Sequence, residues 1–342
     1  MADLFNLDNY FVLLTEDNFN NLKIINITLS SISIIGSGFV FFIYWFFKEI
    51  RSFPLELVVW LCFSNAMCNL SVYVNMETKP IEVSPSCVLQ GFIQMTFDNS
   101  AMIWASIIGF TAYKTVIDYE YIQRNIKRIR IKYLFLGFFL PMALSCAAYI
   151  CEVFGPSGAW CWLDINTTDE NKRKKVLVFV WIAYSVPWFF IFANAYFIIK
   201  AIIILKRNHL SGQEKLIVDK FSKKLRTYPI VMAICILPAT INRIYSVFAD
   251  KENLIMFYFQ TIGDSLQGFL FAIIFGINPA IKEAVKELCF SLFRRQSRSY
   301  RSERSNYDND MNNNNNNFES FISSDELQAK KKLKKISNGG HI

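Results

Sequence analysis

The sequence has 342 residues, of which 53% are hydrophobic and 16% aromatic, and its formal net charge is +8 at pH 7. The polar residues that remain are too few to cover the helices of a large soluble core, so this composition excludes an ordinary soluble protein. Only two histidines occur, His209 and His341, and they cannot form a histidine-based catalytic centre or a zinc site inside a membrane. We therefore expect a membrane protein that is not an enzyme and holds no metal or cofactor.

Seven apolar runs follow one another along the chain, and only three charged residues interrupt them: Asp98, Arg243 and Asp264. A bilayer core has no water to satisfy backbone N–H and C=O groups, so such runs are stable there as helices. The sequence therefore predicts an all-α, seven-transmembrane helix bundle, with six or eight spans as the alternative count. The predicted spans are Ile24 to Phe47, Leu57 to Met76, Val88 to Tyr113, Tyr133 to Cys151, Val176 to Ile199, Thr227 to Phe248 and Asn253 to Ile281.

The basic residues are distributed unevenly between the two sides of these spans. With the N-terminus outside, 28 of the 36 lysines and arginines lie inside and 8 outside, so the positive-inside rule predicts an extracellular N-terminus and a cytoplasmic C-terminus. The exception is Lys172 to Lys175, in the second outer loop. The same loop contains Asn166-Thr167-Thr168, a glycosylation acceptor that is used only outside the cell. A second acceptor, Asn26, lies too close to the membrane to be used.

The eight cysteines fall into two groups on this topology. Cys87 begins span three at its outer end and Cys161 lies in the second outer loop, so an oxidising compartment favours a bridge between them. Cys151, near the outer end of span four, is the competing partner for Cys87. The remaining cysteines lie in the membrane or on the reducing side, where they serve as small apolar residues; they are Cys62, Cys68, Cys146, Cys235 and Cys289.

Charged side chains at membrane depth are costly and usually face a partner or a water-filled cavity. Asp98 and Asp264 each lie about 16 Å inside their spans, a depth at which two carboxylates could share a proton as in aspartyl enzymes. The residues before Asp264, Thr261-Ile262-Gly263, lack the first glycine of the GxGD protease motif, which argues against such an enzyme. Arg243 lies about 7 Å below the outer end of span six. It either snorkels, pairs with Asp264, or forms a counter-charge for an anionic ligand.

The cytoplasmic segments combine basic and apolar residues. The third inner loop, from Glu214 to Arg226, is predicted to extend span six as a basic amphipathic helix. We expect four regions: an extracellular N-terminus (1–23), the seven-span domain (24–281), a short amphipathic eighth helix (282–295) and a disordered tail (296–342). Cys289 is a candidate for palmitoylation. Phosphorylation of the tail would change its charge and recruit a regulator; the candidates are Ser297, Ser299, Ser302 and Ser305.

Several short motifs, in order along the spans, resemble the slime-mould cyclic AMP receptor family of G-protein-coupled receptors, and more closely its cyclic AMP receptor-like branch. The resemblance covers roughly residues 24–293. The motifs are Trp160-Cys161-Trp162, Glu214-Lys215 with Phe221, Lys224, Leu225 and Tyr228, Ile241-Asn242-Arg243-Ile244, Gly268-Phe269 and Asn278-Pro279.

This resemblance implies a plasma-membrane receptor for an extracellular small molecule that activates a heterotrimeric G protein, with a kinase or an arrestin-like regulator at the tail. Membrane lipids are expected partners and nucleic acid is not. The predicted ligand-binding residues are Arg243, Asp98, Asp264, Trp160 and Trp162, next to a Cys87–Cys161 bridge. The predicted G-protein contacts are Lys223, Lys224 and Arg226. No Asp-Arg-Tyr triplet of the rhodopsin-like kind follows span three, and spans one and two lack motifs of the cyclic nucleotide receptors. The ligand is therefore left as anionic or cyclic AMP-like.

Two other classes of seven-span protein are alternatives to a receptor. A retinal protein needs a lysine in the middle of span seven for its Schiff base, and Asn253 to Ile277 contains none. A channel or transporter stays as the alternative, because intramembrane aspartate and arginine also mark ion pathways.

Overall fold

The computed structural model describes residues 16–48, 51–74, 83–157, 160–165, 167–207, 227, 230–245, 254–276 and 286. The chain divides into two units, Met1–Lys282 and Glu283–Ile342, and every described residue except Lys286 belongs to the first. The predicted eighth helix, apart from Lys286, and the predicted tail lie outside the described residues.

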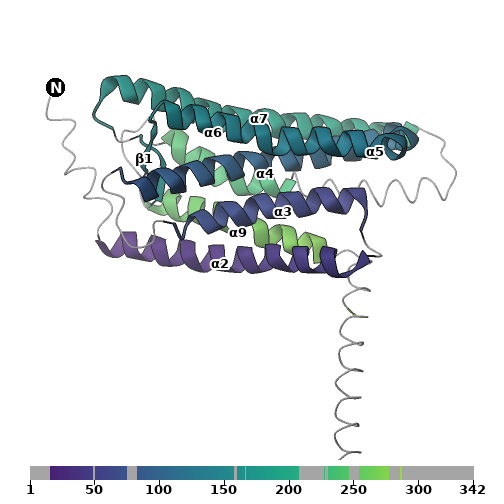
Figure 1. Ribbon diagram of the computed structural model, residues 1–342, viewed down its shortest axis with the longest axis horizontal. Helices are drawn as coiled ribbons and strands as arrows, with labels where there is room; N and C mark the ends of the chain where they lie inside the picture. Colours follow the sequence, from purple (N-terminus) through teal and green to yellow (C-terminus); the bar gives the residue numbers. More distant parts are fainter. Residues whose placement is uncertain are drawn as a thin grey trace, which may run out of the picture. The chain divides into compact units, whose positions relative to one another are not determined.

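Helices dominate the described part of the first unit, as the sequence predicted (Figure 1). The seven helices are α2 (Glu16–Phe46), α3 (Phe53–Ser71), α4 (Pro85–Ile117), a continuous helix made of α5 (Tyr119–Leu134), η3 (Phe135–Phe139) and α6 (Leu140–Ile150), α7 (Glu170–Arg207), helix 230–245 (Ile230–Tyr245) and α9 (Leu254–Gly276). Helix α4 contacts α3, α6 and α7, whereas α2 contacts α3 and α9. Helix α4 therefore lies at the centre of the bundle.

Five of these helices are long and apolar enough to cross a membrane among the described residues. They are Asp17–Phe46, Phe53–Ser71, Pro85–Ile117, Glu120–Ile150 and Glu170–Ile204. Helix 230–245 is apolar but shorter, and at 1.5 Å per residue it covers only about 24 Å. Helix α9 has 23 residues, which is sufficient length, but it contains Gln260, Asp264 and Gln267 and is not among these five.

Helix ends extend beyond the predicted apolar runs where a side chain or proline stabilises the terminus. Helix α4 begins at Pro85, and the hydroxyl of the preceding Ser84 accepts a hydrogen bond from the Cys87 amide. At its other end α4 continues to Ile117, where Asp118 ends it and also caps α5 by accepting from the Tyr121 amide. Caps of this kind need no apolar sequence, so hydropathy alone could not locate them.

One short β-hairpin was not predicted. Strands β1 (Phe154–Ser157) and β2 (Trp160–Leu163) pair antiparallel, with Phe154 opposite Leu163 and Ser157 opposite Trp160. Both strands contact α4. The hairpin follows directly after α6 and lies at one end of the bundle, called here the hairpin end, whereas α5 lies at the opposite end (Figure 1).

Glycine determines how closely the first and last helices approach. A Cβ atom on Gly36 of α2 would lie 3.1 Å from the Cβ of Ala272 and 3.2 Å from the Cα of Phe269, both on α9. A Cβ atom on Gly268 of α9 would lie 2.9 Å from the hydroxyl of Ser37. Helices in a membrane associate through such small residues because lipid provides no hydrophobic driving force between them. This contact positions α9, which carries Asp264.

A π-helical turn, η3, interrupts the fourth helix around Gly137. The Gly137 carbonyl accepts a hydrogen bond of 2.7 Å from the Ser100 hydroxyl, which lies 2.9 Å from the hydroxyl of Ser64. A Cβ atom on Gly137 would lie 2.5 Å from the Trp104 ring. Glycine is therefore required for the indole of α4 to pack against this turn.

Replacing Gly137 with Val should destabilise the bundle by about 1–3 kcal/mol, because the new side chain overlaps the buried Trp104 ring. Gly38→Ala is the matched control, since nothing lies within 4 Å of a Cβ atom added there. Thermal unfolding of the detergent-solubilised protein, followed by tryptophan fluorescence, measures both. Equal midpoints for the Gly137→Val variant and the wild type would contradict the close packing.

Candidate functional site

A small cavity of about 40 Å³ lies between α4, α7, helix 230–245, α9 and strand β2. Its polar lining side chains are Gln94, Asp98, Tyr184, Gln260, Asp264 and Gln267. The indoles of Trp160 and Trp162 also line it. A space of this size holds water rather than an organic ligand, whose pockets usually measure 300–1,000 Å³.

The two intramembrane carboxylates meet at this cavity. Asp98 lies on α4 and Asp264 lies on α9, at the similar depths that their positions in the sequence predicted. Both side chains line the same cavity. Neither carboxylate forms an ion pair within the part of the chain that the structure describes. Because a carboxylate at this depth usually has a partner, the cavity is a candidate site for a ligand or an ion.

Arg243, on helix 230–245, is deeply buried, with only 3% of its surface exposed. Its Nη2 donates a 3.1 Å hydrogen bond to the hydroxyl of Ser157 in β1, and its guanidinium carbon lies 5.3 Å from the ring centroid of Trp162. Within the described part of the chain, its Nε and Nη1 have no hydrogen-bond partner. Of the alternatives drawn from the sequence, snorkelling to water and pairing with Asp264 therefore do not describe the observed arrangement.

A buried guanidinium without an anion is energetically unfavourable. Leaving N–H donors unpaired in a buried site costs about 1–3 kcal/mol for a neutral group and more for a charged one. Stacking on Trp162 compensates part of this cost, since cation–π contacts contribute about 0.5–2 kcal/mol. The remaining donors have no acceptor among the described residues and are available to an acceptor on a ligand.

The hairpin is attached firmly to α4. A disulfide joins Cys87, in the first turn of α4, to Cys161 in β2, with a Cα–Cα distance of 5.1 Å. The Cys161 amide also donates to the Gln90 side-chain oxygen at 3.1 Å. A Cβ atom on Gly91 would lie 2.9 Å from the Phe154 ring, so the strands approach α4 closely. The competing partner Cys151 is a free thiol.

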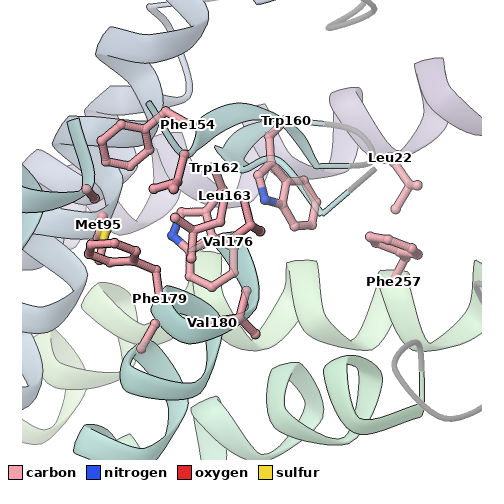
Figure 2. Packing of buried hydrophobic residues seen from close by; sticks show 13 residues of the cluster. Leu22, Met95, Phe154, Trp160, Trp162, Leu163, Val176, Phe179, Val180 and Phe257 are labelled. Atoms are coloured by element: carbon pink, nitrogen blue, oxygen red, sulfur yellow. The ribbon is translucent and has the colours of Figure 1, made fainter. Parts of the chain in front are cut away.

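Aromatic packing holds the two tryptophans of β2 over the cavity. Trp160 lies edge-to-face with Phe257 of α9 at a centroid distance of 5.9 Å, and Trp162 lies edge-to-face with Tyr184 of α7 at 5.8 Å. Figure 2 shows Trp160, Trp162 and Leu163 among side chains of α7 and α9. The hairpin thus forms an apolar roof whose lower surface faces the carboxylates.

Helix 230–245 is held between α7 and α9. The Trp188 indole N–H donates to the Thr240 hydroxyl at 3.0 Å, and the Asn242 amide donates to the Gln260 oxygen at 2.7 Å. A Cβ atom on Gly263 would lie 2.6 Å from the Cys235 carbonyl oxygen, so the two backbones nearly touch next to Asp264. Any movement of this helix must therefore disturb the cavity.

Most of the predicted ligand-binding residues lie together. Asp98, Asp264, Trp160 and Trp162 line the cavity, and Arg243 contacts Trp162 in its roof. Tyr184 and the three glutamines of the lining were not predicted to belong to a site. A signal was present for the glutamines: Gln94 and Asp98 are spaced i, i+4, and Gln260, Asp264 and Gln267 are spaced i, i+4, i+7, which places each set on one helix face.

The basic cluster Lys172 to Lys175 lies in the first turns of α7, at the hairpin end. Lys172 forms an ion pair of 2.6 Å with Asp164, so one charge of this exceptional cluster is neutralised locally. Within the described residues, no group of three or more His, Cys, Asp or Glu side chains could hold a metal ion. The other predicted functional residues lie outside the described residues and stay predictions; they are Asn166, Lys223, Lys224, Arg226, Cys289, Ser297, Ser299, Ser302 and Ser305.

Residues 14–328 match the sequence profile of the family described as "Slime mold cyclic AMP receptor". Among similar proteins, "G-protein coupled receptor 1" of Arabidopsis thaliana is 25% identical over 289 residues, which are 80% of this chain and 83% of that protein. "Cyclic AMP receptor-like protein A" of Dictyostelium discoideum is 24% identical over 252 residues, covering 73% of this chain and 62% of that protein. These relatives and the apolar helices indicate a multi-pass membrane protein of the receptor type. The chain belongs to the slime mold cyclic AMP receptor family.

Proposed function

We propose that this chain is a seven-span receptor of the plasma membrane that binds an extracellular small molecule at the hairpin end and activates a heterotrimeric G protein. The observation that carries the proposal is the cavity under the disulfide-anchored hairpin, which is lined by two carboxylates and covered by Trp162, on which an incompletely paired arginine stacks. Membership of a receptor family supports the signalling role.

The proposed topology has the N-terminus and the hairpin outside the cell. The excess of lysine and arginine in the alternate loops supports it. A disulfide at the hairpin end agrees with this orientation, because such bonds persist in oxidising compartments. We include helix 230–245 and α9 among the seven spans, since tight contacts with neighbouring helices bury their polar groups. The amphipathic eighth helix and the cytoplasmic tail belong to the same proposal.

The ligand is proposed to carry an anionic group that accepts hydrogen bonds from Arg243. Two donors of this side chain are buried and unpartnered, and arginine is well suited to carboxylate and phosphate groups. A cyclic AMP-like molecule is too large for a space of about 40 Å³. Binding must therefore separate the hairpin roof, α7 and helix 230–245, which gives the ligand a means to change the helix arrangement.

Signalling follows if the ligand binds one arrangement of the helices better than another, since only a difference in affinity can shift a conformational equilibrium. Helix 230–245 carries Arg243 and follows the basic loop that contains Lys223, Lys224 and Arg226 in the sequence. A displacement at the cavity would then be transmitted to this loop, which is proposed to contact the G protein.

The ligand contact is tested by a screen of anionic small molecules that includes cyclic AMP, read out by G-protein dissociation in cells. For the active compound, Arg243→Gln should raise the half-maximal concentration about tenfold to a hundredfold, because a hydrogen bond to a charged group contributes about 1.5–3 kcal/mol. Arg243→Lys, which keeps the charge, should lose less. A compound that activates the wild type and the Gln variant equally would remove Arg243 from the site.

The docking role is tested by changing Lys223, Lys224 and Arg226 to Glu. Charge reversal should reduce ligand-stimulated nucleotide exchange to the level without receptor, while surface expression is unchanged. The matched control reverses three tail lysines, Lys330 to Lys332, which changes the net charge equally. Exchange at the wild-type rate in the loop variant would refute docking at this loop.

Removing the disulfide should loosen the roof over the cavity. Cys87→Ala should lower the free energy of unfolding by about 2–5 kcal/mol and weaken the ligand response, because the hairpin loses its covalent attachment to α4. Cys151→Ala, which removes a free thiol nearby, serves as the control. Non-reducing peptide mapping of the wild type provides a direct check, and free thiols at both Cys87 and Cys161 would overturn the expectation.

A further inference from the structure

One exposed face of the fourth helix changes from basic to apolar along its length. We call this face the α5 stripe, and it consists of Arg124, Arg128, Lys132, Phe135 and Phe139. These residues recur every three or four positions, so they follow one side of the helix. All five side chains are exposed, and each phenylalanine retains 56% of its surface. This face has no role in the proposed receptor function.

The opposite face of α5 is held against the bundle. Arg130 donates two hydrogen bonds, of 3.0 and 2.7 Å, to one carboxylate oxygen of Glu56 at the start of α3. The Tyr133 ring stacks on Phe53 of α3 at a centroid distance of 6.2 Å, and Ile122 is buried. These contacts fix the rotation of α5, so the stripe must face away from the bundle.

The position of the stripe along the helix corresponds to a lipid headgroup layer. Counting back from Ile150 at 1.5 Å per residue, a hydrocarbon core of about 30 Å ends near Ile131. Lys132 then lies at the boundary, and Arg128 lies about 4 Å beyond it, inside a headgroup layer about 5–8 Å thick. Arg124 lies about 10 Å beyond the boundary, outside that layer.

The charges within this layer lack protein partners. Neither Arg128 nor Lys132 forms an ion pair or a side-chain hydrogen bond within the described part of the chain. Arg124, in contrast, pairs with Glu120 at 3.1 Å. Below the two free cations, the rings of Phe135 and Phe139 stack at a centroid distance of 4.5 Å and form a flat apolar surface in the hydrocarbon region.

We propose that the part of the α5 stripe from Arg128 to Phe139 is a binding site for an acidic phospholipid. Arg128 and Lys132 bind the phosphate of its headgroup, and an acyl chain lies along Phe135 and Phe139. A phospholipid matches both ends of the stripe, because it joins an anion to a hydrocarbon chain across the same boundary. A lipid bound along the stripe thus contacts α5, the helix that the Arg130–Glu56 ion pair links to α3.

The test uses the full-length protein in nanodiscs that contain phosphatidylcholine and a phosphatidylinositol phosphate with a photoreactive acyl chain. Irradiation followed by peptide mapping should place the label on residues 135–139. Arg128→Gln with Lys132→Gln should reduce that labelling about 30-fold, since each basic residue near the surface contributes about 1 kcal/mol. Arg124→Gln should leave it within twofold, and Arg128→Lys with Lys132→Arg should retain it.

A second measurement does not depend on how the variants fold. In the wild-type protein, excess unlabelled phosphatidylinositol phosphate should displace the label, whereas equal amounts of phosphatidylcholine or of soluble inositol phosphate should not. Equal labelling from a photoreactive phosphatidylcholine, or displacement by the soluble headgroup alone, would overturn the proposal. An unchanged label in the double Gln variant would do the same and leave this face for a protein partner. Nanodiscs present the lipid on both faces, so the result is independent of the proposed orientation.

Discussion

The bundle depends on how closely its helices can approach one another. Apolar side chains gain little from contact with each other in lipid, so helix association is driven by backbone proximity and by polar groups. Gly36 and Gly268 bring α2 and α9 together, Gly263 brings α9 to helix 230–245, and Gly91 brings the hairpin to α4. These three contacts position α9, helix 230–245 and the hairpin, all of which line the cavity. The geometry of the cavity therefore depends on glycines, which have no side chain to hold the helices apart.

The arrangement of the helices also determines the surroundings of the charged side chain Arg243. The polar lining side chains of the cavity come from α4, α7 and α9, and the tryptophans of the hairpin cover them. Arg243 is held by a serine hydroxyl and an indole ring rather than by a carboxylate. This arrangement leaves the buried guanidinium without a carboxylate partner among the described residues, which is costly, and a suitable anionic ligand could relieve that cost.

Hydropathy predicted the helices well because a bilayer imposes a minimum length and purity on any segment that crosses it. The similar positions of Asp98 and Asp264 along their helices followed from the helical rise, and both residues line one cavity. The Cys87–Cys161 pairing followed from topology. The hairpin was missed, because β1 contains Gly155 and Pro156 and two four-residue strands are too short to show a period that distinguishes them from a loop.

The surroundings of Arg243 could not be predicted from the sequence for a different reason. Ser157 and Trp162 lie far from Arg243 in the chain, and they reach it only because the disulfide and Gly91 fix the hairpin on α4. The glutamines of the lining were visible as regular spacings, but an amide in a span more commonly joins two helices. Only the folded structure distinguishes an amide that lines the cavity from one that joins two helices.

The π-helical turn at residues 135–139 sets the angular register between the two halves of the fourth helix. It contains one residue more than an α-helical path would need, and one residue corresponds to a rotation of about 100°. Deleting a single residue there would straighten the hydrogen-bond ladder and turn α5 about its axis by that angle. Arg130 would then swing away from Glu56, and the fourth helix would present a different side to every neighbour of α5.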